Sequence, residues 1–330
     1  MSGAAVELRG VTKRYGDFVA VGDLSLEVPA GTIYGVLGPN GAGKTTTLRM
    51  INDILGPDGG EIRLFGDMAP GRAAARRIGY LPEERGLYPK MRVAETLRFF
   101  GELRGLSGRV AAERAGSWLE RLELAAWARN RVQDLSKGMQ QKVQFAVTLL
   151  HQPDLLILDE PWSGLDPINA EVLRDIVMEQ RAAGRTILFC THLMEQAEKL
   201  CDAVCLIVRG HKVLEGNIRR IKREAAGDRL VAVAFADAEA EARARQTLLA
   251  DPALVAAVRE RGDHLEVELA GEGQALADRL LAQLVAQGAP LRRFELVEPS
   301  LHQIFVDRVG AAADGRGELD RGAPPEVARA

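Results

Sequence analysis

The chain has 330 residues, of which 47% are hydrophobic and 27% charged, and its formal net charge is −3 at pH 7. This composition is typical of a globular protein with about two domains, and it lacks the basic excess expected of a nucleic-acid partner. The apolar runs are too short to cross a bilayer, and no secretion signal is visible. Three cysteines without ligand spacing predict reduced thiols in the cytoplasm.

The first third of the chain predicts a sheet followed by a phosphate-binding loop. Residues 5–35 alternate apolar and polar positions, as in an antiparallel sheet. The segment GPNGAGKT at Gly38–Thr45 matches G-x-x-x-x-G-K-[ST]. A strand pattern precedes it and a helix pattern follows, which favours a phosphate cradle over a plain Gly-rich turn. Its glycines let the backbone approach phosphates, Lys44 supplies positive charge, and the Thr45 hydroxyl is placed to bind Mg²⁺.

Residues from about 85 to 150 show apolar positions at helical spacing. Four aromatic residues of this region could form a docking surface or pack between helices, and we predict packing. They are Phe99, Phe100, Trp118 and Trp127.

Ser136 precedes the helical pattern QQKVQFAVTLL and is predicted to cap it. Its hydroxyl and the following N–H groups then form a second anion site. A second anion site makes little sense within one nucleotide pocket. We therefore expect it to bind the γ-phosphate of ATP held by another subunit.

The run LLILDE predicts a buried parallel strand that ends in two acids. We expect Asp159 to hold Mg²⁺ and Glu160 to orient and polarise the attacking water. Two adjacent acids can also end an ordinary solvated strand, but the upstream phosphate loop favours the functional interpretation. His192 follows the apolar strand TILFC, and on the sequence alone a lone histidine there is more often structural.

Beyond residue 222 the predicted order of elements is β-α-β-β-α-β, the ferredoxin-like arrangement. No catalytic group stands out there, so we expect a regulatory or dimer-supporting domain over residues 223–310. Residues 311–330 lack apolar periodicity and predict a disordered tail.

The ordered set of motifs resembles the ATP-binding subunits of ABC transporters, whose signature LSGGQ matches Leu135, Ser136 and Gly138. The resemblance covers about residues 5–220. It implies that Asp159 and Glu160 are the Walker B acid and the catalytic glutamate. It also implies that Ser163–Asp166 is the D-loop, that His192 senses the γ-phosphate, and that Tyr15 stacks on adenine rather than being an exposed hairpin aromatic. The implied nucleotide-binding residues are Tyr15, Gly38, Pro39, Asn40, Gly41, Ala42, Gly43, Lys44, Thr45, Thr46, Ser136, Lys137, Gly138, Met139 and Asp166.

The sequence departs from the family pattern at two places. Glu83 stands where the family has a glutamine that links the metal site to the membrane partner, and we place it with Thr45 and Asp159 as a metal ligand. A similar LPEERGLY segment occurs in a subset of export-type ABC subunits. In the signature, Lys137 and Met139 replace a glycine and a glutamine, and a lysine would be costly if that position required a positive φ.

The fold that the resemblance implies is α/β, a P-loop ABC ATPase core over residues 1–222 with a mostly parallel sheet, an antiparallel β subdomain and a helical insert, followed by the small α+β domain. The implied function is an ATP- and Mg²⁺-dependent subunit that pairs across two ATP molecules and energises a separate transmembrane permease. Export of a drug, ion or lipid-like substrate is expected, from the cytoplasmic face of the membrane. The alternatives are a soluble ABC ATPase that remodels ribosomes or nucleic acid, and more distantly a P-loop kinase.

Overall fold

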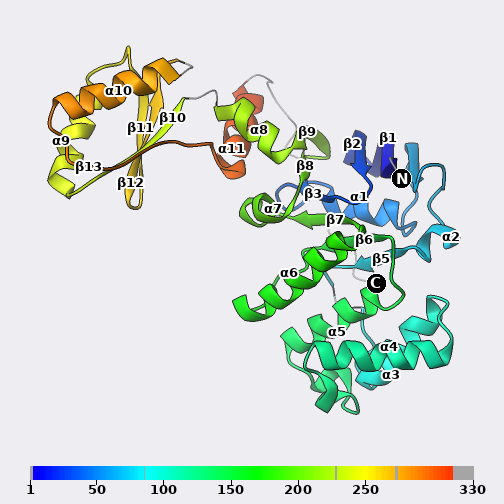
Figure 1. The fold of residues 1–330 in the computed structure, drawn as a ribbon. Coiled ribbons are helices and arrows are strands. Elements are labelled where there is room, and N and C mark those ends of the chain that lie inside the picture. The colour runs from blue at the N-terminus through cyan, green and yellow to red at the C-terminus, as the bar shows by residue number, and fades with distance from the viewer. Residues whose placement is uncertain (1–2, 85, 227–228, 272–273, 315–330) are drawn as a thin grey trace. The chain divides into compact units, whose positions relative to one another are not determined.

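The computed structural model describes residues 3–84, 86–226, 229–271 and 274–314 (Figure 1). These residues form two compact units that divide between Gly216 and Asn217. Residue 222, where the sequence places the domain boundary, lies inside helix α8 (Ile218–Ala226). None of the helices in the described ranges is long and apolar enough to span a membrane.

The first unit is built on a six-stranded sheet with the strand order β5-β6-β7-β3-β8-β9. The neighbours from β5 to β8 pair in parallel. Every residue of β3, β6 and β7 is buried, as expected for parallel strands covered on both faces. The strands are β3 (Ile33–Leu37), β5 (Ile78–Leu81), β6 (Leu155–Asp159), β7 (Thr186–Thr191), β8 (Ala203–Val208) and β9 (His211–Asn217).

A three-stranded antiparallel sheet forms the predicted β subdomain. Its order is β2-β1-β4, from β1 (Ala4–Tyr15), β2 (Phe18–Pro29) and β4 (Gly59–Leu64). The inward side chains of these strands share one hydrophobic cluster with α1 (Lys44–Ile51) and with one face of the parallel sheet. This shared cluster fixes the β1–β2 hairpin beside the loop that precedes α1.

The predicted helical insert contains α3 (Val93–Leu103), α4 (Gly108–Arg121) and α5 (Lys137–Leu149), which pack on one another. The predicted apolar face of α5, which includes Val143 and Phe145, is buried against the other face of the sheet. The remaining helical elements of the unit are α2 (Arg72–Ala75), the 3₁₀ turns Ala125–Trp127 and Val132–Asp134, α6 (Pro167–Ala182) and α7 (Met194–Leu200).

The packing predicted for the insert's aromatic residues is wrong for two of the four. Phe99 is 39% exposed and Trp127 is 38% exposed, whereas Trp118 packs against the second core cluster. Phe99 lies two residues after the fully buried Leu97, and this spacing places it on the opposite side of the helix. Phe99 contacts Phe100 with ring centroids 5.4 Å apart.

The second unit has the β-α-β-β-α-β order that the sequence predicts. Its sheet order is β11-β12-β10-β13, and these neighbours pair in an antiparallel way. Helix α11 includes residues 311–314, which the sequence assigns to the tail; the rest of that tail, 315–330, lies outside the described residues. The elements after α8 are β10 (Leu230–Phe235), α9 (Ala238–Leu249), β11 (Val255–Arg261), β12 (His264–Leu269), α10 (Gln274–Ala286), β13 (Leu291–Leu296) and α11 (Leu301–Asp314).

A half-buried histidine links the segment after α5 to the start of β5. His151 Nε2 donates to Ile78 O at 3.0 Å, and its Nδ1 is buried without a hydrogen-bond partner among the described residues. Burial lowers the pKa of His151 from the usual 6.5 to about 4, and the charges of Arg104, Arg185 and Arg114 add to this effect. The folded state therefore holds this side chain neutral.

We predict that His151 makes the first unit sensitive to acid. Because the folded pKa lies below the unfolded one, the unfolded chain takes up a proton first as the pH falls. Stability is complete above the unfolded pKa and is lost as the pH approaches 4. Between about pH 7 and pH 5 the free energy of unfolding should fall by about 2 kcal/mol more in the wild type than in His151→Gln, which keeps a donor but does not titrate.

Denaturant titrations followed by tryptophan fluorescence measure this difference, because Trp118, Trp127 and Trp162 are the chain's three tryptophans and all lie in the first unit. Parallel pH profiles for the two proteins would contradict the prediction.

Candidate functional site

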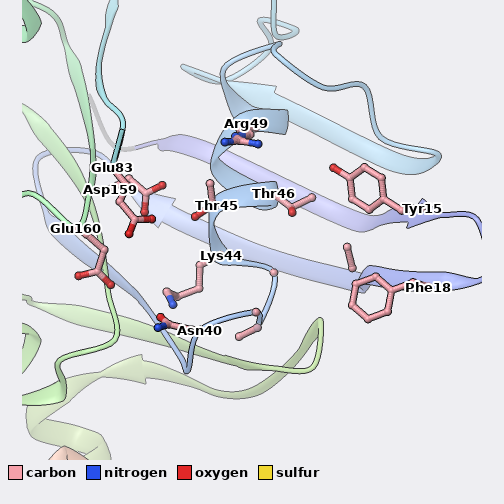
Figure 2. Close-up of a pocket in the computed structure, with 14 residues that line it drawn as sticks. Tyr15, Phe18, Asn40, Lys44, Thr45, Thr46, Arg49, Glu83, Asp159 and Glu160 are labelled. Atoms are coloured by element: carbon pink, nitrogen blue, oxygen red, sulfur yellow. The ribbon is translucent and has the colours of Figure 1, made fainter. Parts of the chain in front are cut away.

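A cavity of about 520 Å³ lies where β3 and β6 end, at the edge at which parallel sheets bind ligands. Figure 2 shows two aromatic rings at one end of it, three acids at the other, and Lys44 and Thr45 between them. Eleven of the predicted site residues line it, together with three that the sequence analysis did not single out. The lining residues are Tyr15, Phe18, Ala20, Asn40, Gly41, Ala42, Gly43, Lys44, Thr45, Thr46, Arg49, Glu83, Asp159 and Glu160.

The loop between β3 and α1 has a backbone that only glycine can adopt at its tightest points. Gly43 has φ +99°, and a Cβ placed on it would lie 2.3 Å from Ala20 O. Gly38 has φ +154°, and a Cβ there would lie 2.1 Å from Ile207 O. Helix α1 begins at Lys44 without a side-chain cap, so its first N–H groups are free to bind an anion in the cavity.

The loop also holds the Lys44 ammonium in place. The side chain is only 6% exposed, and Nζ donates to Gly38 O at 2.8 Å and to Pro39 O at 3.1 Å. Gly38 and Pro39 therefore serve the site through their carbonyls and do not line the cavity themselves. The positive charge lies in the same cavity as the three acids (Figure 2).

Asp159, the last residue of β6, carries a buried carboxylate that lacks compensation. It is 1% exposed, and neither carboxylate oxygen has a hydrogen-bond partner within range among the described residues. Burial raises the pKa of Asp159 and the charge of Glu160 adds to the rise, while the nearby Cys190 thiol and Thr45 hydroxyl oppose it. An ionised carboxylate in this position is stable only with a cation beside it.

Glu83 occupies the same corner of the cavity (Figure 2). Partial burial raises the pKa of its carboxyl, and the negative charges of Asp159 and Glu160 raise it further. No cluster of three or more His, Cys, Asp or Glu side chains that could hold a metal by itself occurs in the part of the chain that the structure describes. The donors present fit Mg²⁺, which binds through one or two carboxylates and takes its other ligands from phosphates and water.

Glu160 is held by β7 and the residues after it. Its Oε2 accepts a hydrogen bond from Thr191 Oγ1 at 3.0 Å, and its Oε1 accepts one from the His192 backbone N–H at 2.8 Å. His192 Nδ1 lies 2.6 Å from the same Oε1. The backbone of Glu160 has φ +46°, a strained value for a residue with a side chain. The structure thus brings the two predicted catalytic residues together, although His192 does not itself line the cavity.

The signature segment does not line the cavity of its own chain. Ser136 caps α5 as predicted, with Oγ accepting from Met139 N–H at 3.2 Å. Lys137 is the first residue of α5 and does not have a positive φ, so the lysine causes no backbone strain there. A Cβ on Gly138 would lie 3.6 Å from Asn169 Nδ2, which places the signature beside the start of α6.

Asp166 also lies outside the cavity. It caps α6, accepting a hydrogen bond from Asn169 N–H at 3.0 Å, and this bond lowers the pKa of its carboxyl. The structure therefore divides the predicted nucleotide-binding residues into two groups. One group forms the cavity, and the other, which includes Ser136, forms a separate surface at the starts of α5 and α6.

Phe18, Ala20 and Arg49 line the cavity without having been predicted from the sequence. Phe18 pairs with Tyr15 across the β1–β2 turn, so a hairpin interpretation of this segment would have placed the two rings together. Arg49 lies four residues after Thr45 on α1 and therefore on the same face of that helix. Phe18 could be found only by recognising the β1–β2 hairpin that carries Tyr15, and Arg49 only by recognising the helix that carries Thr45.

Comparisons with known proteins agree along the chain. Residues 21–163 match the family model described as ABC transporter, and residues 216–309 match the one described as ATP-binding protein DrrA1-3-like, C-terminal domain. The uncharacterized ABC transporter ATP-binding protein YhaQ of Bacillus subtilis is 41% identical over 301 residues, which are 91% of this chain and 97% of the relative.

A Nod factor export ATP-binding protein I from Ralstonia nicotianae is 36% identical over 307 residues, which are 92% of this chain and 94% of the relative. A solved structure of the ATP binding subunit of an ABC transporter is 31% identical, with a TM-score of 0.61, and covers 67% of this chain and 92% of the other. Two lines of observation lead to one conclusion. The relatives match over more than nine tenths of both chains, and the cavity places a glycine-rich phosphate loop beside buried acids. The chain belongs to the ATP-binding proteins of ABC transporters and is an ATPase of that family.

Proposed function

We propose that the chain is the ATP-hydrolysing subunit of an exporter whose membrane-spanning permease is a separate protein. The similarity to a Nod factor export ATP-binding protein and the DrrA1-3-like C-terminal domain support export. The segment LPEERGLY around Glu83 supports the same assignment through the resemblance described above. The cargo belongs to the classes that such exporters carry, namely drugs, ions and lipid-like molecules.

The cavity assigns a role to each of its parts. Tyr15 and Phe18 offer flat apolar faces for the adenine, and the loop before α1 surrounds the phosphates. Thr45, Asp159 and Glu83 would hold Mg²⁺, which, when bound, neutralises charge on the phosphates. Its presence would also compensate the unpaired carboxylate oxygens of Asp159.

Glu160 is the residue that orients and polarises the attacking water. Glu160 lines the cavity, and its carboxylate accepts hydrogen bonds from the Thr191 hydroxyl and the His192 backbone N–H. A carboxylate held in this way can accept a hydrogen bond from water beside a γ-phosphate without first reorganising. His192 orients Glu160 and provides a polar contact near the same phosphate.

Two copies of the chain complete the site. The observation that supports this is the separation of Ser136 and Asp166 from the cavity of their own chain. Ser136, at the start of α5, offers N–H groups to the γ-phosphate of ATP in the opposite copy, and Asp166 lies beside the same interface. Hydrolysis removes the charge that holds the copies together, and the pair then opens.

The permease is expected to contact the exposed aromatic residues of the helical insert. Tyr88 and Phe99 are both exposed, and their rings lie 5.7 Å apart just beyond the Glu83 segment. Such an exposed apolar patch, which begins five residues after Glu83 in the sequence, fits a docking site for a partner protein. In this assignment the chain lies on the cytoplasmic face of the membrane, held there by the permease.

We assign the second unit to an accessory role. Its β-α-β-β-α-β order and antiparallel sheet fit the ferredoxin-like arrangement. Residues 223–310 are the extent that the sequence predicts for it, and regulation or support of the dimer is the function we propose.

Replacing Glu160 with Gln should slow ATP turnover by about 10²–10⁴-fold and leave nucleotide binding intact, because the amide cannot act as a base. The variant should then accumulate as an ATP-bound dimer. Turnover assays and size-exclusion chromatography with Mg-ATP measure both effects, and Glu171→Gln, an exposed acid on α6, is the matched control. Near-normal turnover in Glu160→Gln would exclude this residue as the base.

Replacing Lys44 with Ala should instead weaken nucleotide binding itself, by about tenfold or more, because a charge-assisted bond to phosphate is lost. Titration with a fluorescent ATP analogue measures the dissociation constant. Lys199→Ala removes an exposed positive charge on α7 and should bind ATP like the wild type. Equal affinities for all three proteins would mean that the loop before α1 does not hold the phosphates.

A further inference from the structure

The side chain of Gln144, on α5, forms hydrogen bonds with the main chain on both sides of Glu83. Its Nε2 donates to Pro82 O at 3.1 Å and to Glu84 O at 3.3 Å. The two carbonyls flank the one residue of this loop that lines the ATP cavity. The position of Glu83 is therefore set by a side chain that does not itself line the cavity.

If Gln144 only filled space in the core, it would lower the stability of the fold compared with an apolar side chain. It is 4% exposed, and its Oε1 is buried without a hydrogen-bond partner in the described ranges. An unpaired buried oxygen destabilises the fold, whereas a Met or Leu side chain would fill the space without that loss. What the amide adds over those side chains is its pair of donor bonds to the Glu83 loop.

The same helix holds the loop that carries the other cavity acid. Gln141, one turn earlier, is also buried, and its Nε2 donates to Pro161 O at 3.1 Å, immediately after Glu160. Helix α5 therefore contacts the main chain beside Glu83 and beside Glu160, and Ser136 caps its first turn. Helix α5 thus links the main chain beside two cavity-lining acids to the surface proposed to meet the other ATP site.

We propose that Gln144 is a positioning residue that couples the Glu83 loop to the signature turn at Ser136, so that occupancy of one ATP site changes the affinity and turnover of the other. The inference rests on the proposed function, because Ser136 acts only on ATP held by a second copy. A shift of the Glu83 loop on nucleotide binding moves α5 through the two amide bonds. Without those bonds the loop moves and the helix does not follow.

The test compares the full-length wild type with Gln144→Met, which keeps the length of the side chain and removes both donors, and with Gln144→Leu as a second amide-free variant. Thr148→Val is the matched control, because Thr148 is a buried polar residue one turn further along α5. Its Oγ1 donates to the main-chain O of Gln144 at 2.9 Å and lies 3.4 Å from Tyr80 O, and neither contact involves the Glu83 loop or the Gln144 side chain. ATPase rate against ATP concentration gives kcat and the Hill coefficient. Binding of a fluorescent ADP analogue and thermal melting are measured in parallel.

In both Gln144 variants we expect kcat to fall by about tenfold or more and the Hill coefficient to move toward 1. ADP affinity should stay within about twofold of the wild type, because the phosphate loop is untouched. Wild-type kcat and Hill coefficient in either folded variant would overturn the inference, and so would an equal loss in Thr148→Val, which would indicate a general packing effect.

Failure of the proposed function gives a different result. A wild-type chain that binds ATP but does not dimerise contradicts the proposed function and this inference together. A wild-type chain that dimerises with ATP and hydrolyses it without cooperativity contradicts this inference alone.

Discussion

Uncompensated negative charge at the end of β6 is the constraint on which the site depends. Three carboxylates share one cavity wall, and burial raises the pKa of Asp159 and of Glu83. The Lys44 ammonium, which lies between the acids and the aromatic rings (Figure 2), and the uncapped start of α1 supply positive potential that offsets this cluster. The cavity is thus prepared for a ligand that brings phosphate and a cation together, and each half of the site is less favourable without the other.

The parallel sheet explains why these groups meet. Strands β3 and β6 are buried on both faces, so their polar residues are confined to the ends, and the parallel order brings those ends to one edge. Strand β7 lies between them and delivers Thr191 and His192 against Glu160. These bonds accompany a strained backbone at Glu160 and hold its carboxylate at the cavity.

Features that depend on local pattern could be predicted from the sequence. The phosphate loop, the two acids at the end of β6, the Ser136 cap and the order of elements in the second unit all follow from short-range spacing. Exposure of Phe99 could not be predicted, because helical periodicity defines two faces and only the neighbouring helices decide which one is covered. The helix α11 reaches residues 311–314 although their composition carries no periodic signal.

Contacts between segments that are distant in the chain could not be predicted from the sequence either. Arg49 and Phe18 join the cavity through their neighbours on α1 and on the β1–β2 hairpin, and neither has a motif of its own. The link from Gln144 to the Glu83 loop spans about 60 residues of chain, since the partners are separated by 60 and 62 positions. The sequence around a glutamine on an apolar helix face does not indicate which distant main-chain groups its side chain will bind.

Gln144 holds the Glu83 loop by its main chain, so this contact does not depend on which side chain stands at position 83. The two carbonyls that the amide holds belong to Pro82 and Glu84, and every amino acid presents the same carbonyl group. The side chain at position 83 can therefore change from an amide to an acid while both hydrogen bonds from Gln144 are kept. By the resemblance to the family, Glu83 is such a replacement, and in the proposed function it places a negative charge beside the triphosphate while the hydrogen bonds from Gln144 stay the same.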